Sequence, residues 1–529
     1  MPVSILPPSP SRAVSPRRSL SFGAARPFRG LPRLSLILRA VVFATAVPAR
    51  VPAASQPEVS PVILVQPVSQ SATVGANAVF CAGVSGSEPL AYRWTKDGAP
   101  IASCTGPVLV ASGVSTVNAG SYVVTVSNAT GSARSQPAVL TVISAGQATP
   151  PVVGQGPFSQ TIEDGATAVL SVDAEGDSAR SGTGAAGSPG GADVTYQWLR
   201  DGVPVVGETE AVLVLRGASR SPAGAYRCIL ANSAGSVITE EAVVRVVDDP
   251  CPGHLTMMSC RTYSGTNEKR LFAGFVVGQP AMRGFLPVAL RASGPSLGAK
   301  GAERALRDPV LVLKDSAGFV AANRGWAGDK PVALAAAAMG ADAWDDDQSR
   351  DSALLRTLPC GAYTAEIYGD SGDTGFAVAD VLDARPLSQY TRDSARLVNL
   401  SVRSAVGLGP NVPVMRFTIG GSTSVTLMIR GMGPALAALG ITEVLPTPSL
   451  LLYRMNANGS QTWLQSNTRW GGKRYISEIA GKVGAFPWKS GLAADSAILL
   501  TLPPAQYLLI LSGANGETGV AIMEIYEVA

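Results

Sequence analysis

The second half of the chain is written twice. Asp351-Ser352-Ala353-Leu354-Leu355 returns as Asp495-Ser496-Ala497-Ile498-Leu499, and a glycine-rich stretch at 369–375 returns at 513–519. Two copies of one sequence unit predict two copies of one folded unit, here at 254–385 and 396–529. The copies share turn glycines, prolines and apolar residues of strand type. They share little that could perform acid–base or nucleophilic chemistry, so the duplication predicts architecture more strongly than activity.

The length and composition indicate a turn-rich, all-β protein with several domains. A chain of 529 residues is too long for a single core. It contains 57 glycines and 39 prolines with only 15% charged residues, which is typical of short strands joined by turns. The net charge is +4, and arginines are concentrated before residue 40. The remainder is close to neutral, which does not indicate a nucleic-acid partner.

The N-terminal segment, 1–54, has the order of a secretory signal. A basic region is followed by an apolar run at 34–49, interrupted by Arg39, and then by small residues suited to cleavage. A start codon assigned too far upstream would also explain the long leader. No later segment has the roughly 18 uninterrupted apolar residues of a membrane span. We therefore expect a chain that is secreted, held at the cell surface or periplasmic, with no membrane span in its mature form.

Two segments, 61–143 and 151–247, alternate short β-rich runs with turns. In each, a strand carrying a tryptophan (Trp94, Trp198) precedes an Asp-Gly turn, and a later strand is entered through Ala-Gly-x-Tyr (Tyr122, Tyr226). This pattern resembles the immunoglobulin-like fold in its bacterial surface-protein version. The resemblance implies that the tryptophans pack in the core and that the tyrosines form the hydrogen-bonded corner before strand F. It implies packing roles for these four residues and no ligand contact.

Both segments depart from the immunoglobulin pattern at the cysteines. The first places Cys81 on strand B but Val124 on strand F, and the second has Ser171 and Cys228 there. Neither domain can form the usual inter-sheet disulfide, so we expect Cys81 and Cys228 to be small buried apolar residues. The second domain also contains an insertion at 176–193, whose composition predicts a flexible spacer loop.

The duplicated half carries a recurring signature. It reads R-x-x-G-P-x-L, then N-x-x-W, then D-S-A-L-L-x-T-L-P-x-G-x-Y, then G-x-x-G-x-T-G. It resembles a repeat found beside immunoglobulin-like domains in large secreted proteins of environmental bacteria, Opitutus-like Verrucomicrobia in particular. We predict that each copy is an antiparallel β-sandwich with at most one short helix, at 331–338 in the first copy and near 476–483 in the second. The family implies export and a surface setting, and no established activity.

Two features of the repeats could bind a ligand. Asp370 and Asp373 lie in an oxygen-rich loop that could hold calcium, although turn chemistry alone explains Asp and Gly in a hairpin. The repeated arginine before Gly-Pro, Arg291 and Arg430, could bind a sugar or a carboxylate. The alternative is a buried ion pair, with Asp351 and Asp495 or with Asp380 and Glu524 as the partners.

The cysteines and the single histidine complete the candidates. Six cysteines allow fifteen pairings. Cys260 and Cys360 belong to one copy and have no counterparts in the other, so a bridge between them is the first candidate. His254 is the sole histidine and stands beside a domain boundary, where we expect a solvated imidazole. One histidine leaves no basis for most triads or zinc sites.

We therefore expect a non-enzymatic exported protein that adheres, scaffolds or binds, without a cofactor and with an unknown protein or glycan ligand. A carbohydrate-binding protein is the alternative, because Trp344, Trp463 and Trp488 are unmatched between the copies and could be exposed. A hydrolase is the third hypothesis. A carboxylate pair needs no histidine, but no large domain is left over to hold its cleft.

Overall fold

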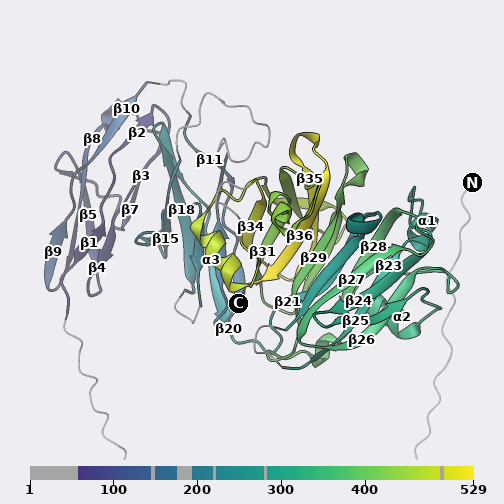
Figure 1. The fold of residues 1–529 in the computed structure, drawn as a ribbon. Helices are drawn as coiled ribbons and strands as arrows, with labels where there is room; N and C mark the ends of the chain where they lie inside the picture. Colours follow the sequence, from purple (N-terminus) through teal and green to yellow (C-terminus); the bar gives the residue numbers. More distant parts are fainter. Residues whose placement is uncertain are drawn as a thin grey trace, which may run out of the picture. The chain divides into compact units, whose positions relative to one another are not determined.

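The computed structural model describes residues 58–144, 149–175, 194–217, 222–278, 283–488 and 494–528. The expected leader at 1–54 and the insertion at 176–193 lie outside these residues. The described chain is all-β with tandem sandwiches, as the sequence predicted (Figure 1).

The first immunoglobulin-like domain pairs its β2 strand in parallel with its last strand, β10. Its main sheet runs β2-β10-β8-β5-β6, with β9 paired to β8, while β1 pairs with β4 and β3 with β7. The strands are β1 (Val62–Val65), β2 (Gln70–Thr73), β3 (Ala78–Cys81), β4 (Gly83–Ser85), β5 (Ala91–Lys96), β6 (Ala99–Pro100), β7 (Val108–Ala111), β8 (Gly120–Asn128), β9 (Gly131–Arg134) and β10 (Ala138–Ile143).

The second immunoglobulin-like domain repeats this topology strand for strand. Its main sheet runs β12-β20-β18-β15-β16, with β19 on β18, while β11 pairs with β14 and β13 with β17. The strands are β11 (Val152–Gln155), β12 (Gln160–Glu163), β13 (Ala168–Ser171), β14 (Asp173–Glu175), β15 (Thr195–Arg200), β16 (Val203–Pro204), β17 (Val212–Leu215), β18 (Gly224–Asn232), β19 (Gly235–Ile238) and β20 (Ala242–Val247).

The four residues assigned by the immunoglobulin resemblance lie inside these two domains. Trp94 and Trp198 are fully buried, and each indole N–H donates to a backbone carbonyl, of Gly106 and Glu210 respectively. The hydroxyls of Tyr122 and Tyr226 donate to the carbonyls four residues upstream, at 2.7 and 2.8 Å. All four side chains are used in packing and hydrogen bonding.

The register of β3 corrects the expectation for Cys81. Successive side chains in a strand point to opposite faces, and Phe80, not Cys81, points into the core. Phe80 stacks on Tyr122 with ring centroids 4.6 Å apart, while Cys81 is half-buried on the other face, beside Val79. Cys228 does lie in the core of its domain. The aromatic pair thus occupies the region where a related domain would place its disulfide.

In the residues that the structure describes, repeat A contains eight strands and two α-helices. They are β21 (His254–Ser264), β22 (Leu271–Val277), β23 (Phe285–Ser293), α1 (Pro295–Ala299), β24 (Pro309–Asp315), β25 (Gly318–Asn323), α2 (Lys330–Ala338), β26 (Ser352–Pro359), β27 (Gly361–Gly369) and β28 (Gly375–Asp383). Helix α2 is the one the sequence predicted. Helix α1 is additional, and it begins with the proline of the Gly-Pro motif at its first turn, where the missing N–H costs nothing.

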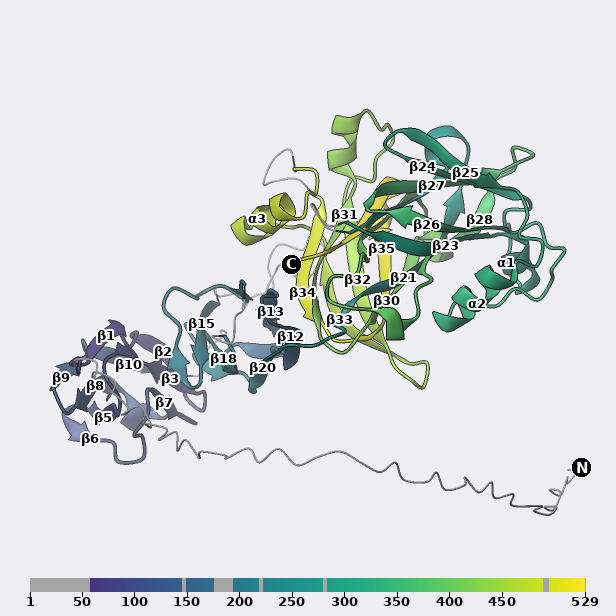
Figure 2. The same ribbon diagram turned by 90° about the horizontal axis from the view of Figure 1, so that it is seen from below.

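Repeat B contains the equivalent eight strands, with a 3₁₀ helix where repeat A has α1. They are β29 (Leu397–Val406), β30 (Val414–Gly420), β31 (Val425–Met432), η5 (Pro434–Leu439), β32 (Pro448–Met455), β33 (Gln461–Asn467), α3 (Arg474–Lys482), β34 (Ser496–Leu502), β35 (Ala505–Gly513) and β36 (Gly519–Glu527). Figure 2 shows α3 beside the strands of this repeat, as α2 lies beside those of repeat A.

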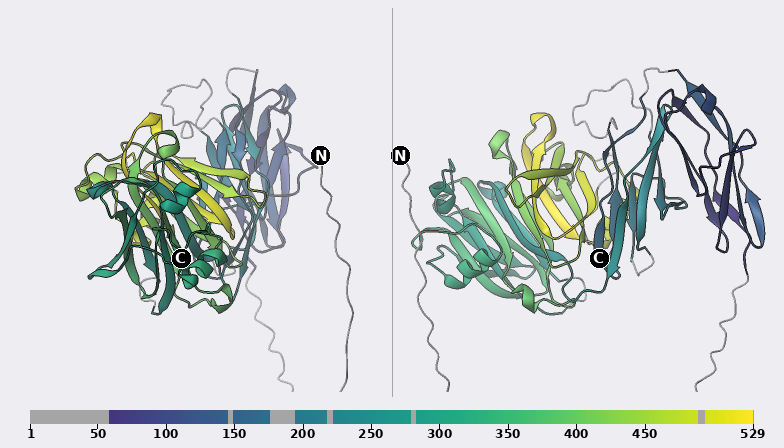
Figure 3. Two further views of the ribbon diagram at one scale, coloured as in Figure 1. Left: turned by 90° about the vertical axis from the view of Figure 1, so that its right-hand side faces the viewer. Right: turned by 180° about the vertical axis from the view of Figure 1, so that it is seen from behind.

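Hydrogen bonding crosses the boundary between the repeats. Strand β21 pairs with β28 of its own repeat and with β30 of repeat B, while β29 pairs with β36 of its own repeat and with β22 of repeat A. All sixteen strands therefore belong to one hydrogen-bonded 16-stranded sheet. Figure 3 shows the green and yellow strands side by side from two further directions. Their inward side chains form a common core that includes Phe275, Leu400 and Phe417.

Each repeat also contains a tyrosine bond like those of the immunoglobulin-like domains. In the motif Leu-Pro-x-x-x-Tyr, the Tyr363 hydroxyl donates to the Pro359 carbonyl at 2.9 Å, and Tyr507 donates to Pro503 at 2.6 Å. Both rings stack on a core phenylalanine, with centroids 5.4 and 5.2 Å apart. The repeated Pro and Tyr thus close the turn between two strands.

We predict that Tyr507→Phe lowers the free energy of unfolding by about 1 kcal/mol, because it leaves the Pro503 carbonyl without its donor while preserving the ring. Urea denaturation of the full chain measures this change. Tyr368→Phe is the matched control, since its ring would remain over Arg270 and the variant should unfold like the wild type. Equal destabilisation by both variants would contradict the assignment.

Candidate functional site: a buried arginine in each repeat

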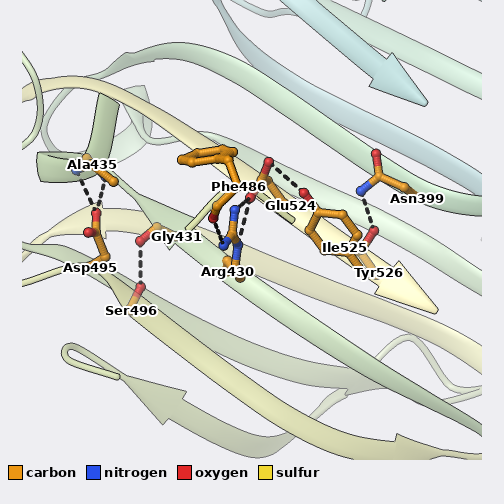
Figure 4. A network of polar contacts seen from close by, with 11 residues as sticks. Asn399, Arg430, Gly431, Ala435, Phe486, Asp495, Ser496, Glu524, Ile525 and Tyr526 are labelled. Carbon is orange, nitrogen blue, oxygen red and sulfur yellow. Dashed lines mark hydrogen bonds and ion pairs between the residues drawn. The ribbon is translucent and has the colours of Figure 1, made fainter. Parts of the chain in front are cut away.

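The repeated arginine of repeat B is buried at the centre of β31. Arg430 has no exposed surface. Its Nε and one terminal nitrogen donate to the same oxygen of Glu524 at 2.9 and 2.6 Å, and the other terminal nitrogen donates to the Phe486 carbonyl at 2.8 Å (Figure 4). Arg430 and Glu524 face each other because their strands, β31 and β36, pair at these two positions.

Aromatic rings enclose the Arg430 guanidinium. Its central carbon lies 4.6 Å from the ring centroid of Phe486, 4.8 Å from Trp488 and 5.6 Å from Tyr526. Trp488 in turn stacks on Trp470, with centroids 4.3 Å apart. Cation–π contacts of this kind stabilise a charge that has been removed from water. Glu524 therefore neutralises the charge of the guanidinium, and the aromatic rings cover it.

Repeat A builds the same arrangement with a looser ion pair. Arg291 approaches the Asp380 carboxylate at 3.4 Å, donates to the Asp342 carbonyl at 2.7 Å and lies 4.3 Å from the Trp344 ring centroid. Asp380 is one methylene shorter than Glu524, so the charges stay further apart. Burial raises the pKa of Asp380, and the nearby Arg291 only partly opposes this. The expected ion pair is thus present in both repeats, with Asp380 and Glu524 as the partners.

The other carboxylates considered, Asp351 and Asp495, hold the Gly-Pro turn instead. Asp351 accepts the Gly294 N–H at 2.7 Å, and Asp495 accepts the Gly433 N–H at 2.8 Å. Burial raises the pKa of Asp495, and these backbone N–H donors counteract the rise. A buried carboxylate at this position satisfies amides that would otherwise have no partner.

The Asn and Trp of the motif hold the chain around Asp495 and the start of β34. The Asn467 side chain accepts the Ala497 backbone N–H at 2.9 Å, and the backbone N–H of Trp470 donates to the Asp495 carbonyl at 2.9 Å. A Cβ on Gly433 would lie 2.0 Å from the Leu445 carbonyl oxygen, so only glycine fits. Repeat A makes the equivalent contacts. The Arg, Gly, Asn, Trp, Asp and Tyr of the repeated signature therefore have structural roles in the fold.

Sequence reasoning missed the tryptophans that cover the two arginines. Trp344 and Trp488 were treated as unmatched and exposed, yet they occupy equivalent places and both are half-buried. They differ by 144 positions, the same offset that separates Trp326 from Trp470. Extending that offset past the helices would have revealed the match. Trp463, the third expected aromatic, is also half-buried, in β33.

The calcium candidates lie in the loop between β27 and β28, where each has a protein partner. Asp370 pairs with Arg324 at 3.0 Å, and Asp373 accepts the Arg307 N–H at 3.0 Å. Within the described residues, no group of three or more His, Cys, Asp or Glu side chains is placed to hold a metal ion. Both carboxylates are thus engaged by residues outside the hairpin.

The expected bridge between Cys260 and Cys360 is not formed. All six cysteines fall in the described part of the chain, and all are free thiols. Cys260 is level with Ser352 across β28 and β23. Cys360 follows Ser352 by eight residues, which corresponds to about 25 Å along a strand. A disulfide needs Cα atoms within about 7 Å. The two cysteines therefore lie too far apart for a disulfide although they belong to the same repeat.

His254 is not a solvated linker residue. It begins β21, is fully buried and stacks on Tyr390 with ring centroids 3.7 Å apart. Its Nδ1 is 2.8 Å from the Pro252 carbonyl, and its Nε2 has no hydrogen-bond partner. Burial lowers the pKa of His254 to about 4. The Pro252 carbonyl opposes this shift, and the charges of Arg396 and Arg385 add to it.

The partner of His254 comes from the segment that joins the repeats. The Tyr390 hydroxyl donates to the Asp383 carboxylate, and the Arg385 guanidinium lies 5.1 Å from the Tyr390 ring centroid. Burial raises the pKa of Asp383 to about 6, against the donors from Tyr390 and Arg385. This buried polar cluster fixes the connection 384–396 against the first strand of repeat A.

Comparison with solved structures gives similarity to immunoglobulin-like domains. No family model and no curated protein matches the chain. The Ig1-2 module of the Drosophila receptor protein tyrosine phosphatase DLAR is 21% identical, covering 35% of this chain and 98% of that one at a TM-score of 0.24. Titin domains I67–I69 are 13% identical over 65% of this chain and 93% of that one (TM-score 0.16). Insect hemolin, an immune protein, is 19% identical over 35% and 47% (TM-score 0.16). These likenesses carry no statement about function.

Among the described helices, none has both the length and the apolar character needed to cross a bilayer.

We predict that Glu524→Gln lowers the free energy of unfolding by about 3 kcal/mol, because it leaves the Arg430 guanidinium buried without its counter-charge. Arg430→Met should cost a similar amount, and the double variant should lose less than the sum of the two. Urea denaturation of the three variants gives the coupling. Lys269→Met is the control. Its ion pair with Glu443 is exposed, so losing it should change the free energy of unfolding far less than losing the buried pair. Additive losses in the double variant would contradict the pairing.

The low pKa of His254 predicts a loss of stability in acid. The unfolded imidazole binds a proton below its ordinary pKa of 6.5, whereas the folded one binds it only near 4. Unfolding therefore takes up a proton between these values, and the stability that this histidine supports is lost as the pH falls through that window, by about 3 kcal/mol in all. Asp383 has the opposite effect, since a raised carboxyl pKa favours the folded state as the pH falls.

His254→Phe keeps an aromatic ring against Tyr390 and removes the titration. We expect its unfolding free energy to fall less than that of the wild type between about pH 6.5 and pH 4. Asp383→Asn should change the slope in the other direction, with a steeper loss in acid. Urea denaturation across this range measures both slopes. Parallel curves for the wild type and His254→Phe would show that the imidazole is accessible to protons in the folded chain.

Proposed function

We propose that this protein is a non-enzymatic, exported binding or scaffold protein that acts at the cell surface or in the surrounding medium. The observation that carries the proposal is how the repeated signature is used. Arg430 binds Glu524, Asp495 binds the Gly433 amide and Tyr507 binds the Pro503 carbonyl. Residues repeated for packing and turn formation are typical of a protein whose repeats present surfaces and loops.

The two immunoglobulin-like domains support the same reading. Each rests on a tryptophan core and a tyrosine corner, an architecture that commonly places variable loops at the ends of a sandwich. Specificity would then reside in the loops in which the domains and the repeats differ. We propose a protein or glycan as the ligand.

Trp344 and Trp488 do not support the carbohydrate-binding alternative, because they cover buried arginines. Trp463 remains the residue on which to test it. If the protein is a scaffold, a glycan array probed with the full chain should show either no binding or binding that persists in Trp463→Ala. Binding that this substitution does remove would favour carbohydrate capture over a scaffold.

Localisation and activity test the main proposal. In the producing cells, an antibody against the full chain should detect it in the medium or on intact cells, where added protease degrades it. The purified chain should release no sugar from a panel of polysaccharides. Detection only inside protease-treated cells would contradict export, and release of sugar would make the protein a hydrolase.

A further inference from the structure

The interface between the two repeats has two-fold symmetry at the level of single residues. Phe275 of β22 is opposite Leu400 of β29, and Phe417 of β30 is opposite Met258 of β21. Adding 142 to Phe275 gives Phe417, and subtracting 142 from Leu400 gives Met258. The two pairings are therefore the same pairing made twice, with the roles of the repeats reversed.

The symmetry axis runs between the two first strands. β21 and β29 are parallel neighbours, with Leu255 level with Leu397 and Tyr263 level with Ala405. Both pairs again differ by 142 positions. At the centre, the Thr262 hydroxyl donates to the Ser404 hydroxyl at 2.7 Å, with both side chains buried. Equivalent atoms thus meet across the axis, as in a symmetric dimer interface.

Neither repeat can complete its sheets alone. Without β29, strand β22 would have an open edge, and the buried Leu397, Leu400 and Val402 would leave the common core. Without β21, strand β30 would lose Leu255, Met258 and Cys260 in the same way. An exposed apolar edge of this kind readily pairs with another strand.

Within one chain, the covalent connection at 384–396 is what holds repeat A next to repeat B of the same molecule. The strand contacts themselves do not depend on which chain supplies each repeat, because the register and the buried residues are the same. Exchange between chains then costs the advantage of the covalent link, which for a short connection corresponds to an effective concentration in the millimolar range. It also costs those contacts of the connection 384–396, such as the stacking of Tyr390 on His254, that the crossing segment gives up.

We propose that this interface also joins two chains. Repeat A of one molecule pairs with repeat B of a second, and the second molecule returns the same pairing, so that a closed two-fold dimer forms with every first strand satisfied. The partner is a second copy of this chain. The inference concerns assembly and stands whether or not the proposed function holds.

Cysteines placed on the axis test the proposal in the full chain. Thr262→Cys and Ser404→Cys are made in two chains that carry different tags. The two are unfolded together in urea, refolded together and mildly oxidised, and the products are separated without reductant. We expect a disulfide-linked dimer that carries both tags, and the fraction of chains found in it should rise about tenfold when the protein concentration rises tenfold at low occupancy.

Three controls define the result. The double variant Thr262→Cys/Ser404→Cys should form the bridge within one chain, which shows that the geometry permits it. Folded chains mixed without unfolding should give no mixed dimer. Thr462→Cys, exposed in β33, should not bridge to Ser404→Cys, which excludes random oxidation of the native thiols.

Wild-type protein provides a measurement that does not depend on these substitutions. Refolded at increasing concentration, it should give a species of twice the monomer mass by light scattering, and dilution should not dissociate it until the chain unfolds. The proposal is overturned if the double variant bridges internally while the mixed chains never bridge. It is equally overturned if the refolded wild type stays monomeric at every concentration.

Discussion

Each repeat depends on the first strand of the other. β21 and β29 are each hydrogen-bonded on both sides, to the last strand of their own repeat and to the second strand of the other. Both strands contribute buried side chains to the common core, among them Leu255 and Met258 of β21 and Leu397 and Leu400 of β29, so each contributes to the core while joining the two repeats. Most other features of the repeats, including the buried arginines and the Gly-Pro turns, lie on strands that pair with these two or next to them. The duplication therefore produces two sandwiches whose strands are hydrogen-bonded to each other, so the repeats form one interlocked unit.

This arrangement changes the meaning of the residues that the copies share. A buried Arg–Glu pair costs desolvation that its mutual attraction need not recover, so its recurrence asks for a physical reason. The reason here is geometric. Arg430 and Glu524 lie opposite each other on paired strands, and the guanidinium also fixes the Phe486 carbonyl and the tryptophan that follows it. The arginine thus attaches the segment after α3 to the sheet, and Arg291 does the same through Asp342 and Trp344.

The sequence predicted the elements better than their partners. Strand content, the helices α2 and α3, and a buried partner for each repeated arginine followed from local pattern, because alternation and motif spacing are properties of a short stretch of chain. The pairing of strands between the two repeats could not be predicted in this way, because the residues of β21 do not specify which neighbouring strand it will pair with. His254 was misjudged for a related reason. Its neighbours in sequence, Pro252 and Gly253, suggested a linker, whereas its burial comes from Tyr390, 136 residues away. Cys81 was misplaced by one residue, which in a strand is enough to reverse the face.

The free cysteines show how the immunoglobulin-like domains manage without a disulfide. In the first domain Phe80 stacks on Tyr122, and its ring centroid lies 6.5 Å from that of Trp94. Packing of aromatic rings thus takes the place of the covalent link. In the second, Leu170 and Cys228 fill the same region with Trp198. Burial raises the pKa of Cys81 to about 11 and that of Cys228 to about 12, which keeps both as unreactive thiols at neutral pH. Cohesion in both domains therefore comes from apolar packing and backbone pairing, and it is independent of the redox state of the compartment in which the chain folds.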